Sequence, residues 1–464
     1  MLDILQHTEK PSAATCNACK VCAPLGASVA FKGIQGCMPL IHGSQGCTTY
    51  IRRYLISHFK EPVDIASSNF SQDTTIFGGA KNFNISIDNI IKQYKPGIIG
   101  IASTCLSETI GENVSQMIQE YKISHKGEDV PELVYASTPS YNGTHVDGFH
   151  EAVTSLVQAF SQGGRRGEHI NVFPGFVSPE DLRYLKEILY DFFIEFAVLP
   201  DYSATLDSGI WEDYKPIPPG GTSLEQIKIT GTAHASLEFG HILNSSQTKI
   251  KVDEEIHQPS AALYLKNRFA VERFHTGMPI GINATDNLFE ILEELSLYGT
   301  PEKYEQERSR LVDSYIDGHK YVFGKRAIIY GEEDFVIGLA SFLQEIGMKT
   351  ILAVSGGASG KFKSLLTKVA GEDIKTLNDG DFEQMAELAK ELKPDILIGN
   401  SKGYYIAHEL GIPLVRVGFP IHDRISGQRI LHIGYRGAQQ LFDRITNALI
   451  EYKQDHSPVG YKYM

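Results

Sequence analysis

All six cysteines of this 464-residue chain lie within its first 105 residues: Cys16, Cys19, Cys22, Cys37, Cys47 and Cys105. Three of them form the run Cys16-x-x-Cys19-x-x-Cys22, and Cys47 ends a loop of small residues that begins at Gly43. Structural cysteines scatter wherever a small apolar side chain fits a core. The clustering therefore indicates a metal or disulfide site at one end of a large protein.

Composition narrows the chemistry of this site. The net charge is −13 and the hydrophobic content is 42%, which argues against a polyanion-binding surface and thus against a nucleic-acid partner. No run approaches the roughly 20 apolar residues of a membrane helix, and the first residues lack the features of a secretory signal. We expect a cytoplasmic protein without a membrane partner. Because the cytosol keeps thiols reduced, thiolate ligation of iron–sulfur or zinc is favoured over disulfides.

Short β-branched runs alternate with helical patterns from about residue 95 onward. Strands are predicted at 98–102, 133–136, 170–173, 194–199, 327–330, 350–354, 395–398 and 414–417, and helices include 114–121 and a charged segment at 301–321. This alternation predicts an α/β fold of parallel sheets flanked by helices. We expect three blocks: an N-terminal cluster-binding domain (1–165), a second domain (166–320) and a third domain with a C-terminal helix (321–464).

Two candidate ligands follow predicted strands. Cys105 comes after the strand at 98–102, and Ser140 comes after the strand at 133–136. Ligands of open α/β sheets bind beyond the carboxyl ends of the strands. We therefore expect Cys105 and Ser140 to face one site.

The other candidate thiols are bordered by glycines. Cys22 precedes Gly26, and Cys47 follows Gly43 and Gly46. An iron–sulfur cluster takes thiolates from several chain segments, and glycines allow the backbone to come close to it. We predict Cys22, Cys47 and Cys105 as metal ligands, with flanking cofactor contacts from Gly43, Gly46, His42 and Ser140.

The remaining cysteines have other interpretations. Cys37 is expected to be a small buried hydrophobe. Cys16 and Cys19 lack the fourth cysteine of a ferredoxin run and the second Cys-x-x-Cys pair of a zinc ribbon, so an extra ligand pair and a redox-labile pair both stay open. The segment 355–361 departs from a phosphate-binding loop at two positions, and a tight strand-to-helix turn is expected there.

Several longer strings together resemble the nitrogenase component 1 family, in its β-type branch. They lie at 24–27, 38–47, 58–62, 77–79, 104–111, 138–141, 171–176 and 418–424, so the resemblance covers nearly the whole chain. It implies three Rossmann-like domains and pairing with an α-type subunit (NifE-type or NifD-type) in an α2β2 heterotetramer. It also implies electrons from an ATP-dependent iron-protein reductase.

The resemblance also assigns site residues. Cys22, Cys47 and Cys105 match the three β-side cysteines of a cluster shared with the α-type partner, and Ser140 matches the serine near it. The implied cluster is [4Fe-4S] or a larger [8Fe-7S] group. Within the complex, the resemblance also implies a precursor of the iron–molybdenum cofactor.

Two functions follow from the family, and a third does not depend on it. The segment at 17–26 and the ending at 458–464 resemble the assembly scaffold of the NifN type, on which that cofactor matures. Retention of all three cysteines is also compatible with the catalytic β subunit of the NifK type, or with a related reductase, which would make the complex an oxidoreductase. The third alternative is a solitary redox or metal-storage protein.

Overall fold

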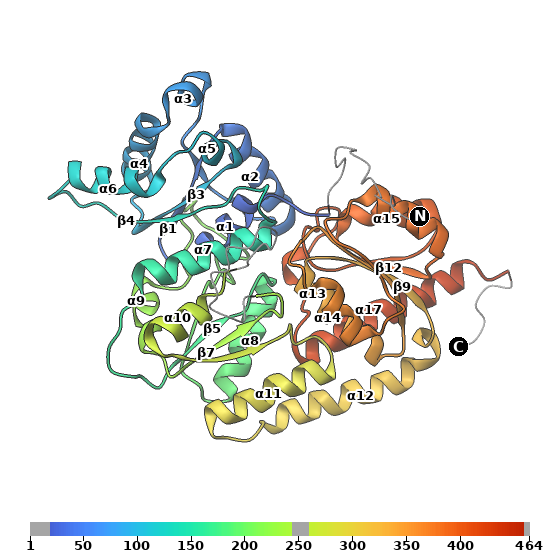
Figure 1. Ribbon diagram of the computed structural model, residues 1–464. Helices are drawn as coiled ribbons and strands as arrows, with labels where there is room; N and C mark the ends of the chain where they lie inside the picture. The colour runs from blue at the N-terminus through green and yellow to red at the C-terminus, as the bar shows by residue number, and fades with distance from the viewer. Residues whose placement is uncertain (1–18, 244–258, 459–464) are drawn as a thin grey trace, which may run out of the picture.

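The computed structural model describes residues 19–243 and 259–458 (Figure 1), so Cys16 lies outside the described residues. Within them the chain forms three sheets whose strand pairs are all parallel. The α/β fold with three helix-flanked parallel sheets is confirmed.

The first sheet has the order β2-β1-β3-β4 and contains β1 (Cys37–His42), β2 (Ala66–Ser67), β3 (Ile98–Ser103) and β4 (Glu132–Ala136). The second has the order β6-β5-β7-β8 and contains β5 (Ile170–Phe173), β6 (Phe196–Val198), β7 (Ala235–Phe239) and β8 (Glu272–Thr276). The third has the order β11-β10-β9-β12-β13 and contains β9 (Arg326–Gly331), β10 (Lys349–Ser355), β11 (Lys375–Leu377), β12 (Ile396–Gly399) and β13 (Leu414–Arg416).

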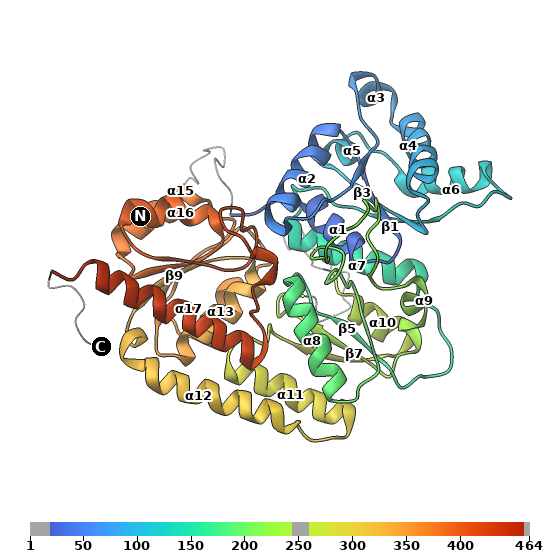
Figure 2. The same cartoon turned by 180° about the vertical axis from the view of Figure 1, so that it is seen from behind.

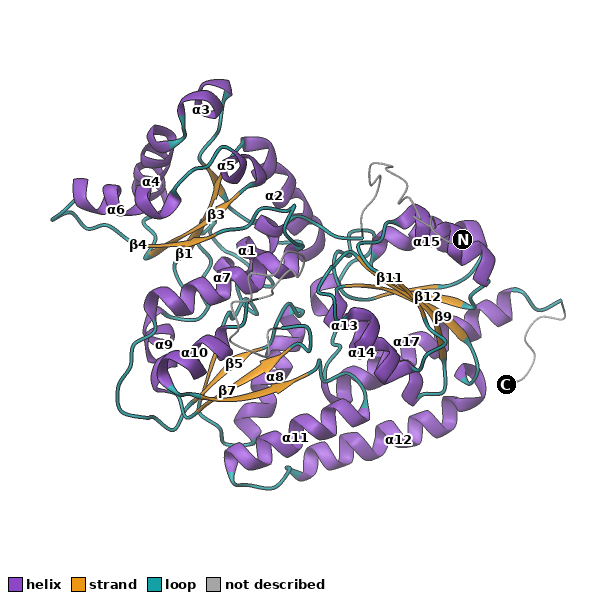
Figure 3. Cartoon of the chain, in the orientation of Figure 1, coloured by secondary structure: helices purple, strands orange, loops and turns teal. Residues whose placement is uncertain are grey.

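Helices cover the faces of these sheets (Figure 3). Those before the second sheet are α1 (Ala23–Lys32), α2 (Gln45–Phe59), α3 (Gln72–Phe77), α4 (Ala80–Tyr94), α5 (Cys105–Thr109), α6 (Val114–Ser124) and α7 (His145–Phe160). Those that follow β5 and β7 are α8 (Pro179–Asp191), α9 (Leu224–Lys228), α10 (Ala261–Phe269) and α11 (Ile282–Ser296). The rest are α12 (Glu302–Val322), α13 (Glu333–Glu345), α14 (Phe362–Ala370), α15 (Phe382–Leu392), α16 (Tyr404–Leu410) and α17 (Gly434–Asp455), with short 3-10 turns at Ile229–Thr232, Ser401–Gly403 and Gly427–Arg429.

The predicted strands agree with β3, β4, β5, β6, β9, β10, β12 and β13, and the charged segment forms α12. The pattern missed β1, β7 and β8, and also the short strands β2 and β11. Strand β1 contains Pro39, and a proline within a run argues against a strand inside a sheet. Strand β8 carries the polar residues Glu272, Arg273 and His275, which hide it from a search for apolar runs.

The three sheets fall inside the three predicted residue ranges, and we keep the boundaries near 165 and 320 as a proposal. The first two sheets share a core, because α7 lies between them and packs against both α1 and α10 (Figure 1). The long helices α12 and α17 pack against each other beside the third sheet.

Candidate functional site

The candidate site lies at the carboxyl edge of the first sheet, where three helices begin. Cys47 lies in the first turn of α2 after β1, and Cys105 is the first residue of α5 after β3. Cys22 is the N-cap of α1. The positive end of a helix dipole favours a thiolate. All three predicted ligands lie at the starts of helices.

Close backbone approach brings the Cys47 and Cys105 loops together. A Cβ atom on Gly43 would lie 2.3 Å from the Thr104 hydroxyl oxygen, which no side chain tolerates. Across this contact the Thr104 hydroxyl donates to the His42 carbonyl at 3.2 Å. The absence of a side chain at Gly43 therefore lets the β1–α2 loop pack against the β3–α5 loop. This packing explains a glycine at position 43 without a contact to a cofactor.

Ser140 links the segment of Cys22 to Cys105. Its hydroxyl accepts a hydrogen bond from the Ala23 backbone N–H at 3.1 Å, next to Cys22. Its own backbone N–H donates to the Cys105 sulfur at 3.2 Å. Ser140 thus bridges α1 and α5 from the loop that follows β4, as its position after a strand predicted.

Helix α1 is fixed by its contact with α7. A Cβ on Gly26 would lie 1.6 Å from the His145 carbonyl oxygen, and one on Gly148 would lie 2.0 Å from the Ala23 carbonyl oxygen. The two helices therefore touch through backbone atoms. This contact sets the position of Cys22 at the start of α1.

The three thiols interact electrostatically. The pKa of the Cys22 thiol is raised to about 11, mainly by burial; the backbone N–H of Leu25 opposes this rise, and charge on Cys47 or Cys105 adds to it. Without a compensating cation, Cys22 therefore stays protonated at neutral pH. A positively charged metal group at this edge would reverse that balance.

The three thiols differ in exposure and are not arranged as the ligands of one metal ion. Cys22 and Cys47 are half-buried and Cys105 is exposed. Among the described residues, no three His, Cys, Asp or Glu side chains are placed to bind one metal ion. A single ion needs its ligands at one point, whereas the thiolates of an iron–sulfur cluster each bind a different iron. That these thiols hold one cluster stays a prediction.

Sequence reasoning missed Glu108, which organises the strand ends. Its carboxylate accepts hydrogen bonds from the hydroxyls of Tyr135 and Ser137, both at 2.7 Å, and from that of Ser103. Burial raises the pKa of Glu108, but these three donors outweigh burial and hold it below its usual value. Glu108 lies three residues after Cys105, but its hydrogen-bond partners come from β3 and from the end of β4. Its role therefore depends on strand pairing that the local sequence does not show.

His42 is placed away from the thiols. It shares the β1 face of Met38 and Leu40, and its ring packs edge-on against Phe70 and Phe83. Its Nε2 lies 3.3 Å from a Glu112 carboxylate oxygen. Burial lowers the pKa of His42, so the ring tends to neutrality although Glu112 opposes this shift. Its described contacts serve the core, and its predicted role toward the cofactor is untested.

Gly46 and the remaining cysteines differ in their surroundings. Gly46 is exposed, and a Cβ there would meet only the Ser44 hydroxyl at 3.8 Å. Cys37 is 1% exposed in β1, as expected for a small hydrophobe. Cys19 is buried among residues of the third sheet, where burial raises its pKa to about 12. Cys19 is therefore a protonated core thiol apart from the other three.

The segment that resembled a phosphate loop is the turn between β10 and α14, as expected. Its Lys361 ammonium donates to the carbonyls of Ile242 and Leu243 at 3.1 and 2.9 Å. The Lys361 ammonium therefore binds backbone carbonyls of this chain.

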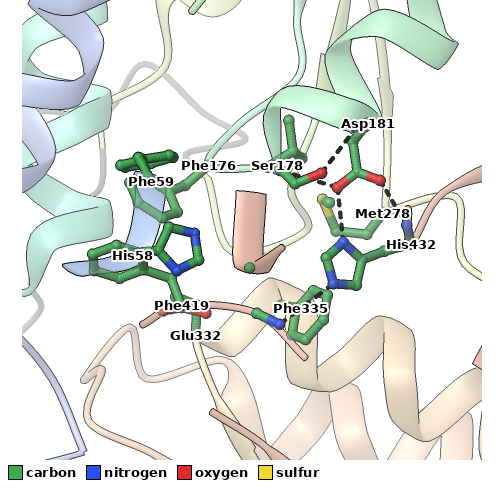
Figure 4. A pocket seen from close by; sticks show the side chains of 13 residues that line it. His58, Phe59, Phe176, Ser178, Asp181, Met278, Glu332, Phe335, Phe419 and His432 are labelled. Atoms are coloured by element: carbon green, nitrogen blue, oxygen red, sulfur yellow. Dashed lines mark hydrogen bonds and ion pairs between the residues drawn. The ribbon is translucent and has the colours of Figure 1, made fainter. Parts of the chain in front are cut away.

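Apart from the thiol edge, a small cavity lies where the three sheets meet (Figure 4). The aromatic rings of Phe59, Phe176, Phe335 and Phe419 surround it. In its wall the Asp181 carboxylate lies 2.9 Å from Nδ1 of His432. The free volume is about 20 Å³, roughly the room for one water molecule. This cavity is too small for a cofactor of several metal atoms.

No helix within residues 19–243 and 259–458 combines the length and apolar character needed to cross a membrane.

Known proteins share this arrangement over nearly the whole chain. Residues 22–450 match the family described as nitrogenase component 1 type oxidoreductase. The nitrogenase molybdenum-iron protein beta chain of Clostridium pasteurianum is 35% identical over 440 residues, which cover 94% of this chain and 93% of the relative. The cofactor biosynthesis protein NifN of Nostoc sp. is 33% identical over 437 residues, which cover 94% and 93%.

A solved structure has the same fold. The structure titled "Nitrogenase Cp1 at pH 6.5" superposes with a TM-score of 0.91 at 33% identity and covers 98% of both chains. Together with the family match, these similarities extend across all three sheets. The chain therefore belongs to the nitrogenase component 1 family, in its β-type branch.

Proposed function

We propose that this chain is the β-type half of a cofactor-assembly scaffold and carries an iron–sulfur cluster at its interface with an α-type subunit. The observation that carries the proposal is the gathering of Cys22, Cys47 and Cys105 with Ser140 on the open edge of the first sheet. Three thiols on a partly exposed edge leave the other side of a cluster to a partner. A [4Fe-4S] or an [8Fe-7S] group would use them in this way.

The residues of this chain have separate tasks in that site. Cys22, Cys47 and Cys105 would hold the cluster, which supplies one-electron transfer when bound. The Ser140 backbone N–H donates to the Cys105 sulfur and orients it. Glu108 keeps three hydroxyls at the strand ends in place, which fixes the loops on which Cys105 and Ser140 lie.

The precursor of the iron–molybdenum cofactor would lie in the α-type partner. This placement follows from the family resemblance, and the cavity where the three sheets of this chain meet, with a free volume of about 20 Å³, has no room for such a group. This chain would then relay electrons from an iron-protein reductase toward the precursor. We place the complex in the cytoplasm, as an α2β2 heterotetramer.

Scaffold function is supported by the sequence at 17–26 and 458–464, which resembles assembly scaffolds. The second candidate is the catalytic β subunit of nitrogenase, in which the same cluster would feed dinitrogen reduction. It is favoured by the retention of all three cysteines and by the beta chain that is 35% identical to this chain. A NifN protein at 33% identity is almost as similar, so overall identity does not separate the two.

Activity measurements separate these candidates. The chain is purified with its α-type partner and supplied with iron protein, ATP and reductant, and ammonia from dinitrogen is measured. A scaffold forms little or no ammonia, but after loading with precursor it activates a cofactor-free nitrogenase in a second assay. Robust ammonia formation by the complex itself overturns the scaffold in favour of the catalytic subunit.

A further inference from the structure

We propose that the third domain positions Cys22 through residues 19–21, which we call the strap. Figure 2 shows this start of the described chain running from the third sheet to α1. Cys22 begins α1 in the first domain, whereas the residues just before it are held by loops of the third. The importance of this for a cluster rests on the proposed role of Cys22 as a ligand.

The first anchor of the strap is Cys19. Its backbone N–H donates to the Gly380 carbonyl at 3.0 Å. Its side chain is 8% exposed and belongs to the apolar cluster that contains Tyr330, Leu352 and Phe382. Cys19 is thus a core residue of the third domain, although it lies near the start of the chain.

The second anchor is a backbone contact with the β10–α14 turn. A Cβ on Gly356 would lie 2.6 Å from the Lys20 Cβ and 2.7 Å from the Cys19 carbonyl carbon. The strap therefore lies directly on the backbone of this turn. The Lys20 ammonium also pairs with the Asp379 carboxylate at 2.6 Å, an exposed pair that contributes little by itself.

The far end of the strap is fixed to the first domain. The Val21 carbonyl accepts a hydrogen bond from the His145 N–H at 3.0 Å, at the start of α7. His145 in turn bonds a Glu332 carboxylate oxygen of the third domain at 2.7 Å through Nε2. His145, the first residue of α7, therefore contacts both the strap and the third domain.

The strap is short, so it transmits movement. The three peptide steps from Cys19 to Cys22 span at most about 11 Å. A displacement of the third domain by a few ångström would therefore pull on Cys22. Cys105 lies on the loop that β3 of the first sheet carries and would stay in place, whereas Cys47 lies on α2, whose far end bonds the third domain through His58 and Ile421. Relative to Cys105, Cys22 is thus the thiol whose position depends on the third domain.

Alkylation of the cluster-free chain tests this dependence. Gly356→Ala places a methyl group against the strap, and Gly299→Ala is the matched control because nothing lies within 4 Å of a Cβ there. Neither glycine has a positive φ. Each variant is treated with N-ethylmaleimide, and the modification of Cys22, Cys47 and Cys105 is followed by peptide mass spectrometry.

We expect Gly356→Ala to raise the alkylation rate of Cys22 relative to Cys105 at least about fivefold, since a locally opened thiol is more accessible. Gly299→Ala should leave the ratio unchanged. An unchanged ratio in a Gly356→Ala chain with native circular dichroism would overturn the proposal.

A second pair of variants decides the matter if Gly356→Ala does not fold. Cys19→Gln places a larger polar side chain in the apolar cluster and should expel the strap, whereas Cys19→Ala should leave it in place. Equal Cys22 alkylation in these two variants would likewise overturn the proposal.

Failure of the proposed cluster site gives a different result. Iron content is measured in the complex with its partner, for the unchanged chain and for Cys22→Ala. Equal iron in both would remove Cys22 from the ligand set, while the alkylation ratios of the cluster-free chain would still report on the strap.

Discussion

Cys37 and Cys47 lie on one strand–helix unit and have opposite surroundings. Cys37 is 1% exposed inside β1, and burial raises its pKa to about 12. Cys47 is half-buried in the first turn of α2, with the Ser44 hydroxyl 3.5 Å from its sulfur. The environment, and not the residue type, separates a core thiol from a candidate ligand.

Replacing these two cysteines distinguishes their roles. Cys47→Ala should lower the iron bound per protein in the complex with the α-type partner, because it removes a proposed thiolate ligand. Cys37→Ala should keep the iron and lower the free energy of unfolding by about 1 kcal/mol, as a small cavity does. Metal analysis and denaturant unfolding measure both effects. Equal iron in the two variants would argue against ligation by Cys47.

Glu333 predicts a pH dependence of stability. Burial raises its pKa to about 7, against donors from Ser359 that lower it. An unfolded Glu has a pKa near 4.3, so between these values the folded chain binds a proton that the unfolded chain has released. Raising the pH therefore lowers the free energy of unfolding until about pH 7, above which this loss is complete.

Glu333→Gln should weaken that pH dependence, because an amide has no proton to release. Its Oε1 can still accept from Ser359, and its amide nitrogen replaces the buried Oε2, which has no hydrogen-bond partner. Denaturant unfolding at pH 5.5 and pH 8 measures the effect, with the exposed Glu391→Gln as control. A decline in stability as steep as in the unchanged chain would show that Glu333 does not titrate in this range.

At the level of elements, the helix–helix contact of α1 and α7 predicts a sharp steric effect. Gly26→Ala should destabilise the chain by several kcal/mol, because its Cβ would lie 1.6 Å from a backbone oxygen and such overpacking forces the helices apart. It should also displace Cys22 and reduce bound iron. Thermal unfolding and iron analysis test both. Gly97→Ala is the control, since nothing lies within 4 Å of a Cβ there.

Elements with regular local patterns were predictable, and those defined by distant contacts were not. The apolar run of β3 and the charged helix α12 appear in the sequence as they do in the fold. Strand β7 contains Glu238, a poor strand signal, which is buried because Arg273 pairs with it at 2.6 Å. Arg273 belongs to β8, so neither residue explains the other until the sheet has formed.

The same limit applies to the site. The positions of Cys105 and Ser140 after strands predicted that they face one site, and a hydrogen bond joins them. The burial of Cys19 in the third domain depends on Gly380 and Tyr330, far away in sequence. Local spacing alone therefore left the role of Cys19 open, whereas the fold places its side chain among residues of the third sheet.

At the scale of the molecule, exposed apolar side chains near the thiol edge predict where the partner binds. Tyr50 is 43% exposed, Tyr141 61% and Phe77 84%. On binding the α-type subunit, amide hydrogen exchange should slow in the segments 44–50, 72–78 and 139–142, because an interface excludes water from its centre. The exposed faces of α12 serve as an internal reference. Protection confined to α12 would place the partner elsewhere.

The strap that joins Cys19 and Lys20 to residues 356, 379 and 380 has a consequence for biosynthesis. The ribosome makes Cys22 early, but the segments that anchor the residues before it leave the ribosome much later. At about 5–20 residues per second, that interval is roughly 20–70 s. During it the nascent chain can pack α1 against α7, but the residues just before Cys22 are not yet held by the third domain. The order of synthesis would thus delay a complete metal pocket until nearly the entire polypeptide has been translated.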